Sequence, residues 1–220
     1  PATTTDFAQW RDRLMGRAEN VFRQLASRKP AAAEADPADA LMRQQERVLA
    51  DIRRLAEMPP HALKIRHHGD LHLGQILIAK DDVFILDFEG EPQRSLLERR
   101  QKAPAARDVA GLVRSLDYAA ASAIAALGEM SADERNILTG RLGTLRDELT
   151  AALWNGYRDA LTDDRLWPAD EAGQHQLLAF FELEKALYEI EYEIENRPDW
   201  LHIPVGGVIR ILERAGGRPS

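Results

Sequence analysis

The sequence predicts a mainly α-helical fold that contains one small β-hairpin. Two observations support this expectation. Apolar residues recur every three or four positions over most of the 220 residues, which is typical of amphipathic helices. One stretch near the middle of the chain instead holds two short apolar runs around a polar turn, which is typical of a hairpin. A chain of this length is long enough to bury a core of its own.

The first part of the chain predicts two helices. Apolar residues recur at helical spacing in Asp6–Ser27, where Thr5 or Asp6 could cap the start. Residues 28–38 hold two prolines and few bulky apolar groups, so they are expected to form a loop. A second helix is expected over Asp39–Glu57, ending before Pro59–Pro60.

The centre and the rest of the chain give the other elements. The hairpin is expected to pair residues 75–79 with residues 83–86, and its apolar runs predict that it is buried. After Asp108 the sequence is helical almost throughout. The ranges expected to be helical are Val109–Ala126, Ala132–Leu161, Gln174–Asn196 and Val208–Ala215.

Composition excludes several kinds of function. A formal net charge of -7 argues against binding of a nucleic-acid backbone as the main task. The absence of cysteine excludes disulfides and thiolate metal sites, which fits a cytoplasmic protein. The most apolar tract, Tyr118–Leu127, is shorter than the ~20 residues of a membrane span, and no signal peptide is recognisable. We therefore expect a soluble protein that binds neither nucleic acid nor membrane.

The segment around the hairpin gathers oxygen-bearing side chains. Gln75 begins the first expected strand and Asp87 follows the second, and a hairpin brings these two points together. Amide and carboxylate oxygens, joined by those of Glu89 or Glu91, are suitable ligands for Mg²⁺.

Asp70 lies on the loop that enters the hairpin and is expected to face the same cleft. A carboxylate that does not bind metal can orient and deprotonate a hydroxyl group. In the kinase catalytic loop the base is followed five residues later by a metal-binding amide and then by an Asp-Phe-Gly element. Here Asp70, Gln75 and residues 87–90 have this order and spacing, which predicts phosphoryl transfer with ATP and Mg²⁺.

The motifs HGDLHLGQ and DFEGEP resemble those of the aminoglycoside-phosphotransferase-like kinases, and specifically of bacterial maltokinases. The resemblance covers most of residues 62–212. It implies the C-terminal lobe of a protein-kinase-like fold, reached through a helical segment at residues 1–60 and occupying residues 61–220. It also implies ATP-dependent phosphorylation of maltose to maltose 1-phosphate in α-glucan metabolism, often by an enzyme fused to a trehalose synthase. Residues 1–60 contain no phosphate-covering loop or strand lysine, so the N-terminal lobe is expected to be missing and the chain alone inactive.

The resemblance also implies roles for single residues. Asp70 would be the catalytic base, with His68 beside it in the loop. Gln75 and Asp87 would bind Mg²⁺ and the nucleotide phosphates, with Glu89 as a further metal ligand. The residues expected to support the loop are Gly69, His72 and Asp108, the last through hydrogen bonds from the helix beneath.

A sugar site is expected on the last long helix. Lys185, Tyr188, Glu189 and Tyr192 are spaced so that they share one helix face. Aromatic faces edged by charged groups suit a disaccharide, and the resemblance implies Lys185, Tyr192 and Arg210 as sugar contacts.

Other interpretations remain open at this point. The acceptor could be another sugar or an aminosugar, and the chain could be a non-catalytic kinase-like domain that assists a fused enzyme. Three imidazoles could bind zinc, those of His67, His68 and His72. Tyr188 and Tyr192 could belong to the core. Arginines such as Arg107 and Arg114 could bind phosphate or form ion pairs with the acidic surplus, and the glutamates of the last long helix are expected to lie mostly on a solvated face.

Overall fold

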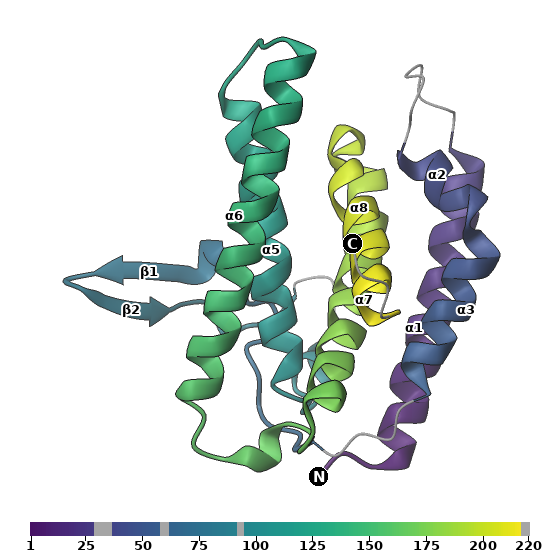
Figure 1. Ribbon diagram of the computed structural model, residues 1–220. Coiled ribbons are helices and arrows are strands. Elements are labelled where there is room, and N and C mark those ends of the chain that lie inside the picture. The colour runs from purple at the N-terminus through teal and green to yellow at the C-terminus, as the bar shows by residue number, and fades with distance from the viewer. Residues whose placement is uncertain (29–36, 58–61, 92–94, 217–220) are drawn as a thin grey trace.

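The computed structural model describes residues 1–28, 37–57, 62–91 and 95–216, and within them the fold is helical apart from one hairpin (Figure 1). Helices α5 (Ala106–Ala126) and α6 (Ala132–Asp159) stand side by side next to the hairpin. Helices α7 (Glu171–Asn196) and α8 (His202–Ala215) occupy the centre. The N-terminal helices cover the opposite side. The expected fold class, mainly α with one hairpin, agrees with this arrangement.

Helix α1 (Thr4–Ser27) begins two residues earlier than the expected Asp6. Its cap is Thr3 rather than Thr5 or Asp6, because the Thr3 hydroxyl accepts from the Asp6 N–H while the Asp6 carboxylate accepts from the Thr3 N–H. Its apolar stripe faces the centre of the molecule. The buried residues of this stripe are Phe7, Trp10, Leu14, Ala18, Val21, Phe22 and Leu25.

The helix expected over residues 39–57 is two helices, α2 (Pro37–Arg43) and α3 (Gln45–Ala56). Gln44 separates them with ψ near 13°, outside the helical range. The break lets α2 pack on α8 while α3 packs on α1, so each buries its own apolar side. Residues 29–36 of the expected loop and the Pro59–Pro60 stop lie outside the described residues.

Helix α7 is the central element and packs against α1, α3, α5 and α8. Three of the four expected C-terminal helices have nearly the expected bounds. Helix α8 begins at His202 rather than Val208. Pro204 is compatible with this earlier start because it lies in the first turn, where a missing N–H is tolerated. The short elements are α4 (Leu96–Arg99) and the 3₁₀ turns η1 (Leu73–Gln75), η2 (Asp164–Leu166) and η3 (Pro198–Trp200).

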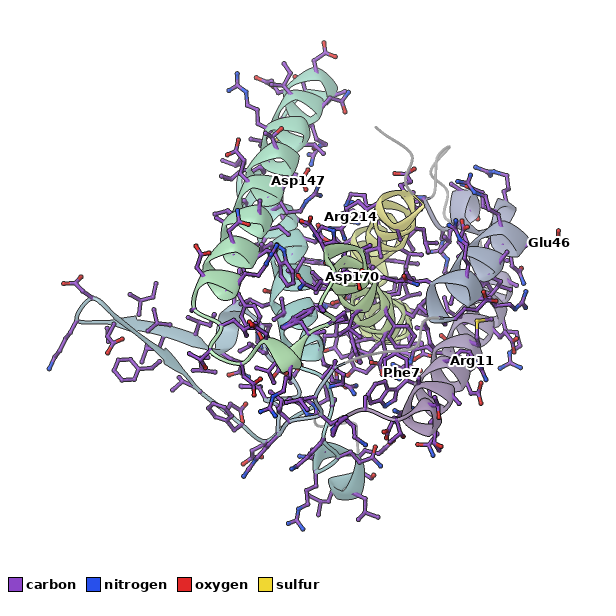
Figure 2. The ribbon with its side chains drawn as sticks, turned by 60° about the horizontal axis from the view of Figure 1, so that its bottom comes forward. Phe7, Arg11, Glu46, Asp147, Asp170 and Arg214 are labelled. Carbon is purple, nitrogen blue, oxygen red and sulfur yellow. The ribbon has the colours of Figure 1, made fainter. Side chains whose placement is uncertain are left out.

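The hairpin consists of β1 (Ile76–Ala79) and β2 (Asp82–Ile85), with Ile76 opposite Ile85. Lys80 and Asp81 both have positive φ, as a two-residue hairpin turn of the primed type requires. The expectation that the hairpin is buried is wrong. Ile78 is 75% exposed and every residue of β2 is exposed, because no other described strand or helix covers either face. Figures 1 and 2 show the hairpin extending away from the helices.

Helix α5 has the length and hydropathy of a membrane span, the one such helix among the described residues. Buried helices of soluble proteins meet the same criterion. In this fold α5 packs against α6, α7 and α8.

Candidate functional site

The loop that carries Asp70 is held from beneath by the start of α5. The Asp108 carboxylate accepts hydrogen bonds from the backbone N–H groups of His68 at 2.7 Å and of Gly69 at 2.9 Å. These are the bonds that the resemblance implies for Asp108. Gly69 has φ of +88°, a conformation that favours glycine. The next residue, Asp70, is thereby set at a fixed point above α5.

Close packing of the loop on α5 depends on a second glycine. A Cβ at Gly111 would lie 2.6 Å from the Leu71 carbonyl oxygen, closer than real contacts allow. Only a residue without a side chain therefore lets the loop approach the helix at this point. This role of Gly111 was not predicted from the sequence.

The histidines of the loop serve its backbone. The ring of His68 is buried, with Nε2 2.6 Å from the Leu86 carbonyl oxygen and Nδ1 3.3 Å from the Asp70 N–H nitrogen. Nδ1 of His72 accepts from the Gly74 N–H and begins η1. Both imidazoles therefore contact backbone atoms of the loop, and no group of three histidine or acidic side chains that could hold a zinc ion is found among the described residues. His68 contacts the backbone of the candidate base, so it positions the base.

Gln75 and Asp87 meet at the root of the hairpin. The Gln75 Nε2 group donates to the Asp87 carboxylate at 3.1 Å, so the two side chains lie together, as the hairpin geometry predicts. Asp87 has φ of +59°, an unusual conformation for a residue other than glycine, which costs of order 1–3 kcal/mol and recurs at functional sites.

This pair fits a magnesium site in its donor chemistry. Mg²⁺ is held by one or two protein oxygens and otherwise by water and substrate phosphates. No group of three histidine or acidic side chains arranged for a metal occurs among the described residues, so phosphate oxygens would have to complete the shell. Glu89, the expected further ligand, is exposed in the turn after Asp87.

Asp70 forms an ion pair with Lys185 of α7. The Lys185 Nζ atom lies 3.1 Å from Asp70 Oδ1 and 2.9 Å from Glu91 Oε1. Glu91 is only 4% exposed, so the ammonium group joins the loop to a buried carboxylate. Burial of Lys185 opposes its charge, but the attraction of Glu91 and Asp70 prevails and raises its pKa above the ordinary value.

The expected sugar-binding face of α7 is only partly assembled around Asp70. Tyr188 lies beside Lys185, whose Nζ is 5.0 Å from the ring centroid, and both line a small recess with Asp70. Tyr188 and Tyr192 also line a cavity of about 490 Å³ between α1 and α7, which Arg17 and Asn20 of α1 help to form. Neither tyrosine is fully buried, so neither is a simple core residue.

Glu189 and Arg210, two other expected sugar contacts, do not line the recess that contains Asp70. Glu189 is buried and binds Arg114 of α5 through Nε at 3.0 Å and Nη2 at 2.6 Å. Arg114 also pairs with Asp117, to which Arg210 of α8 donates at 2.7 Å. Glu189, expected on the sugar-binding face of α7, is instead engaged in this buried ion pair. Glu182 and Glu193 are also buried, contrary to the expected solvated face.

Asp117 was not predicted from the sequence as part of this cluster. Its position three residues after Arg114 on a helix was the available signal, since i,i+3 pairs of opposite charge lie side by side. Nothing in the sequence indicated that Arg146 of α6 would donate to the same carboxylate.

Comparison with known proteins identifies sugar kinases as similar proteins. No protein family model matches the chain. It is 28% identical over 220 residues to a glucosamine kinase of Mycolicibacterium smegmatis, covering 97% of the chain and 48% of that protein. It is 29% identical over 204 residues to a glucosamine kinase of Streptacidiphilus jiangxiensis, covering 93% of the chain and 42% of that protein. The chain thus spans about half the length of the curated relatives that it matches.

Solved structures of glucosamine kinases share the fold. One, in a crystal form B, has a TM-score of 0.72 and 22% identity over 97% of this chain and 47% of that chain. Another, in complex with glucosamine, ADP and inorganic phosphate, has a TM-score of 0.67 and 24% identity over 97% of this chain and 49% of that chain. The similar proteins are therefore sugar kinases, and they do not show the more specific expectation of a maltokinase.

Proposed function

We propose that this chain is the acceptor-binding and catalytic lobe of a kinase that transfers the γ-phosphate of ATP to a hydroxyl group of a sugar or aminosugar. One observation carries the proposal. Asp70 lies on the loop that enters the hairpin, and Gln75 and Asp87 meet at the root of that hairpin. Their order and spacing are those of a kinase base and its metal-binding side chains. The glucosamine kinase relatives support the same reaction class.

Phosphoryl transfer requires a base for the acceptor hydroxyl and separate ligands for the metal ion, and different residues would serve these two roles. Asp70 would accept the proton of the attacking hydroxyl and orient its oxygen toward the phosphate. The oxygens of Gln75 and Asp87 would hold Mg²⁺, which supplies charge neutralisation for the nucleotide phosphates. Asp108 and His68 keep the loop in place while the proton moves. Lys185 holds the Asp70 carboxylate in position through their ion pair.

Two acceptor classes follow from different observations. Both curated relatives are glucosamine kinases, so an aminosugar is the first acceptor to test. A neutral sugar such as maltose is the second, because the Lys185 ammonium lies 3.1 Å from Asp70 and would repel a protonated amino group there. The maltokinase resemblance points to the same neutral acceptor. A fused trehalose synthase is implied by that resemblance alone.

We further propose that residues 61–220 form a C-terminal lobe that works with a second lobe. The exposed apolar side chains of the hairpin, such as Ile78 and Phe84, form the surface on which that lobe would dock. A complete kinase also needs a phosphate-covering loop and a lysine on a strand. The 220-residue chain by itself is therefore expected to be inactive.

ATP-dependent phosphorylation by the full-length natural protein tests the function. Glucosamine, maltose, glucose and trehalose would be offered in turn, with an Asp70→Asn variant as control. The expected result is phosphorylation of one of these sugars that the variant lowers by at least ~10²-fold. Activity on none of them would favour the non-catalytic kinase-like domain, whereas undiminished activity of the variant would exclude Asp70 as the base.

A further inference from the structure

The loop that carries Asp70 and the segment that follows the hairpin meet where each has a glycine. A Cβ at Gly69 would lie 3.3 Å from the Cα atom of Gly90, which is tighter than most real contacts. Both glycines have positive φ, +88° and +77°, a conformation that favours a residue without a side chain. The two backbones therefore approach closely, and the residues that come next, Asp70 and Glu91, line the same recess.

Asp70 and Glu91 share the ammonium group of Lys185. The Nζ atom lies 3.1 Å from Asp70 Oδ1 and 2.9 Å from Glu91 Oε1, so both carboxylates pair with one cation. The side chain of Glu91 is 4% exposed, whereas that of Asp70 is 23% exposed. Because charges attract more strongly where water is excluded, Glu91 holds the ammonium group more firmly than Asp70 does.

A lysine needs such an anchor if its charge is to stay at one point. Its ammonium group sits on a flexible four-carbon stem, which can place the charge in many positions. The ring of Tyr188 flanks the Nζ atom of Lys185 at 5.0 Å but offers it no carboxylate. Without Glu91, the ammonium group could close onto Asp70 and cover the oxygen that has to receive the proton.

We propose that Glu91 is a positioning residue for the candidate base. It fixes Lys185 so that the ammonium group orients Asp70 through Oδ1 and leaves Oδ2 to accept the proton of the attacking hydroxyl. This role of Glu91 rests on the proposed function. The sequence indicated Glu91 as a possible Mg²⁺ ligand, but its Oε1 faces an ammonium group, and neither Gln75 nor Asp87 lines its recess.

Steady-state kinetics of the full-length natural protein test this role, with ATP and whichever of glucosamine, maltose, glucose and trehalose it phosphorylates. Glu91→Gln keeps the shape of the side chain and removes the charge that holds Lys185. We expect kcat to fall about tenfold and the sugar KM to change by less than about twofold, because orientation of the base matters in the transition state. Glu129→Gln, exposed in the turn between α5 and α6, is the matched control and should leave both constants unchanged.

A second background separates a role through Asp70 from a general loss of structure. Residues that act as one unit do not have additive effects on the rate. In an Asp70→Asn background, Glu91→Gln should therefore lower the residual kcat no further. A loss of structure would lower it in either background.

An unfolding measurement tests the shared cation without requiring activity. Urea unfolding of the 220-residue chain would compare the wild type, Asp70→Asn, Glu91→Gln and the double variant. Each single variant leaves Lys185 with one of the two carboxylates, whereas the double variant leaves its ammonium group with neither. The double variant should therefore lose more unfolding free energy than the two single losses together.

The role of Glu91 and the proposed function can fail separately. An active wild type whose Glu91→Gln variant keeps its kcat, or changes only KM, would refute the role of Glu91 alone. A further fall of kcat in the Asp70→Asn background, or additive losses of stability, would do the same. A wild type that phosphorylates none of the sugars would refute the proposed function, and with it the role of Glu91.

Discussion

The Lys185 ammonium group lies 3.1 Å from the Asp70 carboxylate, and it simultaneously binds Glu91 at 2.9 Å. The carboxylate proposed as the base therefore shares one cation with a buried acid. Because α7 carries the lysine and the loop above α5 carries the aspartate, this contact joins the two halves of the candidate site. Any movement of α7 relative to α5 would change the charge next to the base.

Replacing Lys185 by methionine should destabilise the protein. The change leaves Glu91 buried without its cation, and breaking a buried pair from one side costs about 3 kcal/mol. Urea unfolding measures the loss, with the exposed Lys102→Met as the matched control. The double variant Lys185→Met/Glu91→Gln should recover part of the stability. If it is no more stable than Lys185→Met, the pair does not exist as described.

The Arg114–Glu189 pair should behave as a coupled unit. Both side chains are at most 10% exposed, so Arg114→Met and Glu189→Gln should each destabilise the fold by roughly 3–5 kcal/mol. The double variant should lose less than the sum, by more than about 1 kcal/mol. Unfolding free energies of the four proteins measure this coupling. Additive losses would mean that the two side chains do not interact.

Alanine at Gly111 and at Gly140 should have opposite effects. A Cβ at Gly111 would meet the Leu71 carbonyl oxygen at 2.6 Å, so the loop must move and stability should fall by about 1–3 kcal/mol. At Gly140, in the middle of α6, nothing lies within 4 Å, so alanine should stabilise the helix by ~0.5–1 kcal/mol. Thermal unfolding compares them. A stabilising Gly111→Ala would show that the loop does not pack on α5 this closely.

Asp6 should make stability depend on pH in the acid range. Burial alone would raise its pKa, but hydrogen bonds from Lys64 and Thr3 lower it from 3.8 to about 2. Because the pKa is lower in the folded state, the stabilisation is complete above pH 3.8 and is lost as pH falls toward 2. The stability difference between wild type and Asp6→Asn should shrink over this interval. A stability difference that grows as the pH falls would contradict the assignment.

Much of this molecule could be predicted from local sequence patterns. Apolar spacing identified α1, α5, α6 and α7, because a helix repeats every 3.6 residues whatever it packs against. The hairpin and the proximity of Gln75 to Asp87 followed from two apolar runs and a polar turn. The HGD motif located Asp70. It also located His68 and Gly69, whose backbone N–H groups donate hydrogen bonds to the Asp108 carboxylate.

Other features depend on elements that are far apart in the chain. The sequence places Lys185 on a helix face, but only the approach of α7 to the loop pairs it with Asp70, 115 residues away. Helical spacing groups Glu189 with Tyr192. In the folded chain, however, the Glu189 side of α7 faces α5, so Glu189 is buried against Arg114. The exposure of the hairpin was also hidden, since apolar composition predicts burial without saying what covers the surface. Local patterns therefore determined the elements and the catalytic motifs, whereas long-range packing decided which charges meet, because ion pairing depends on distances that no local spacing specifies.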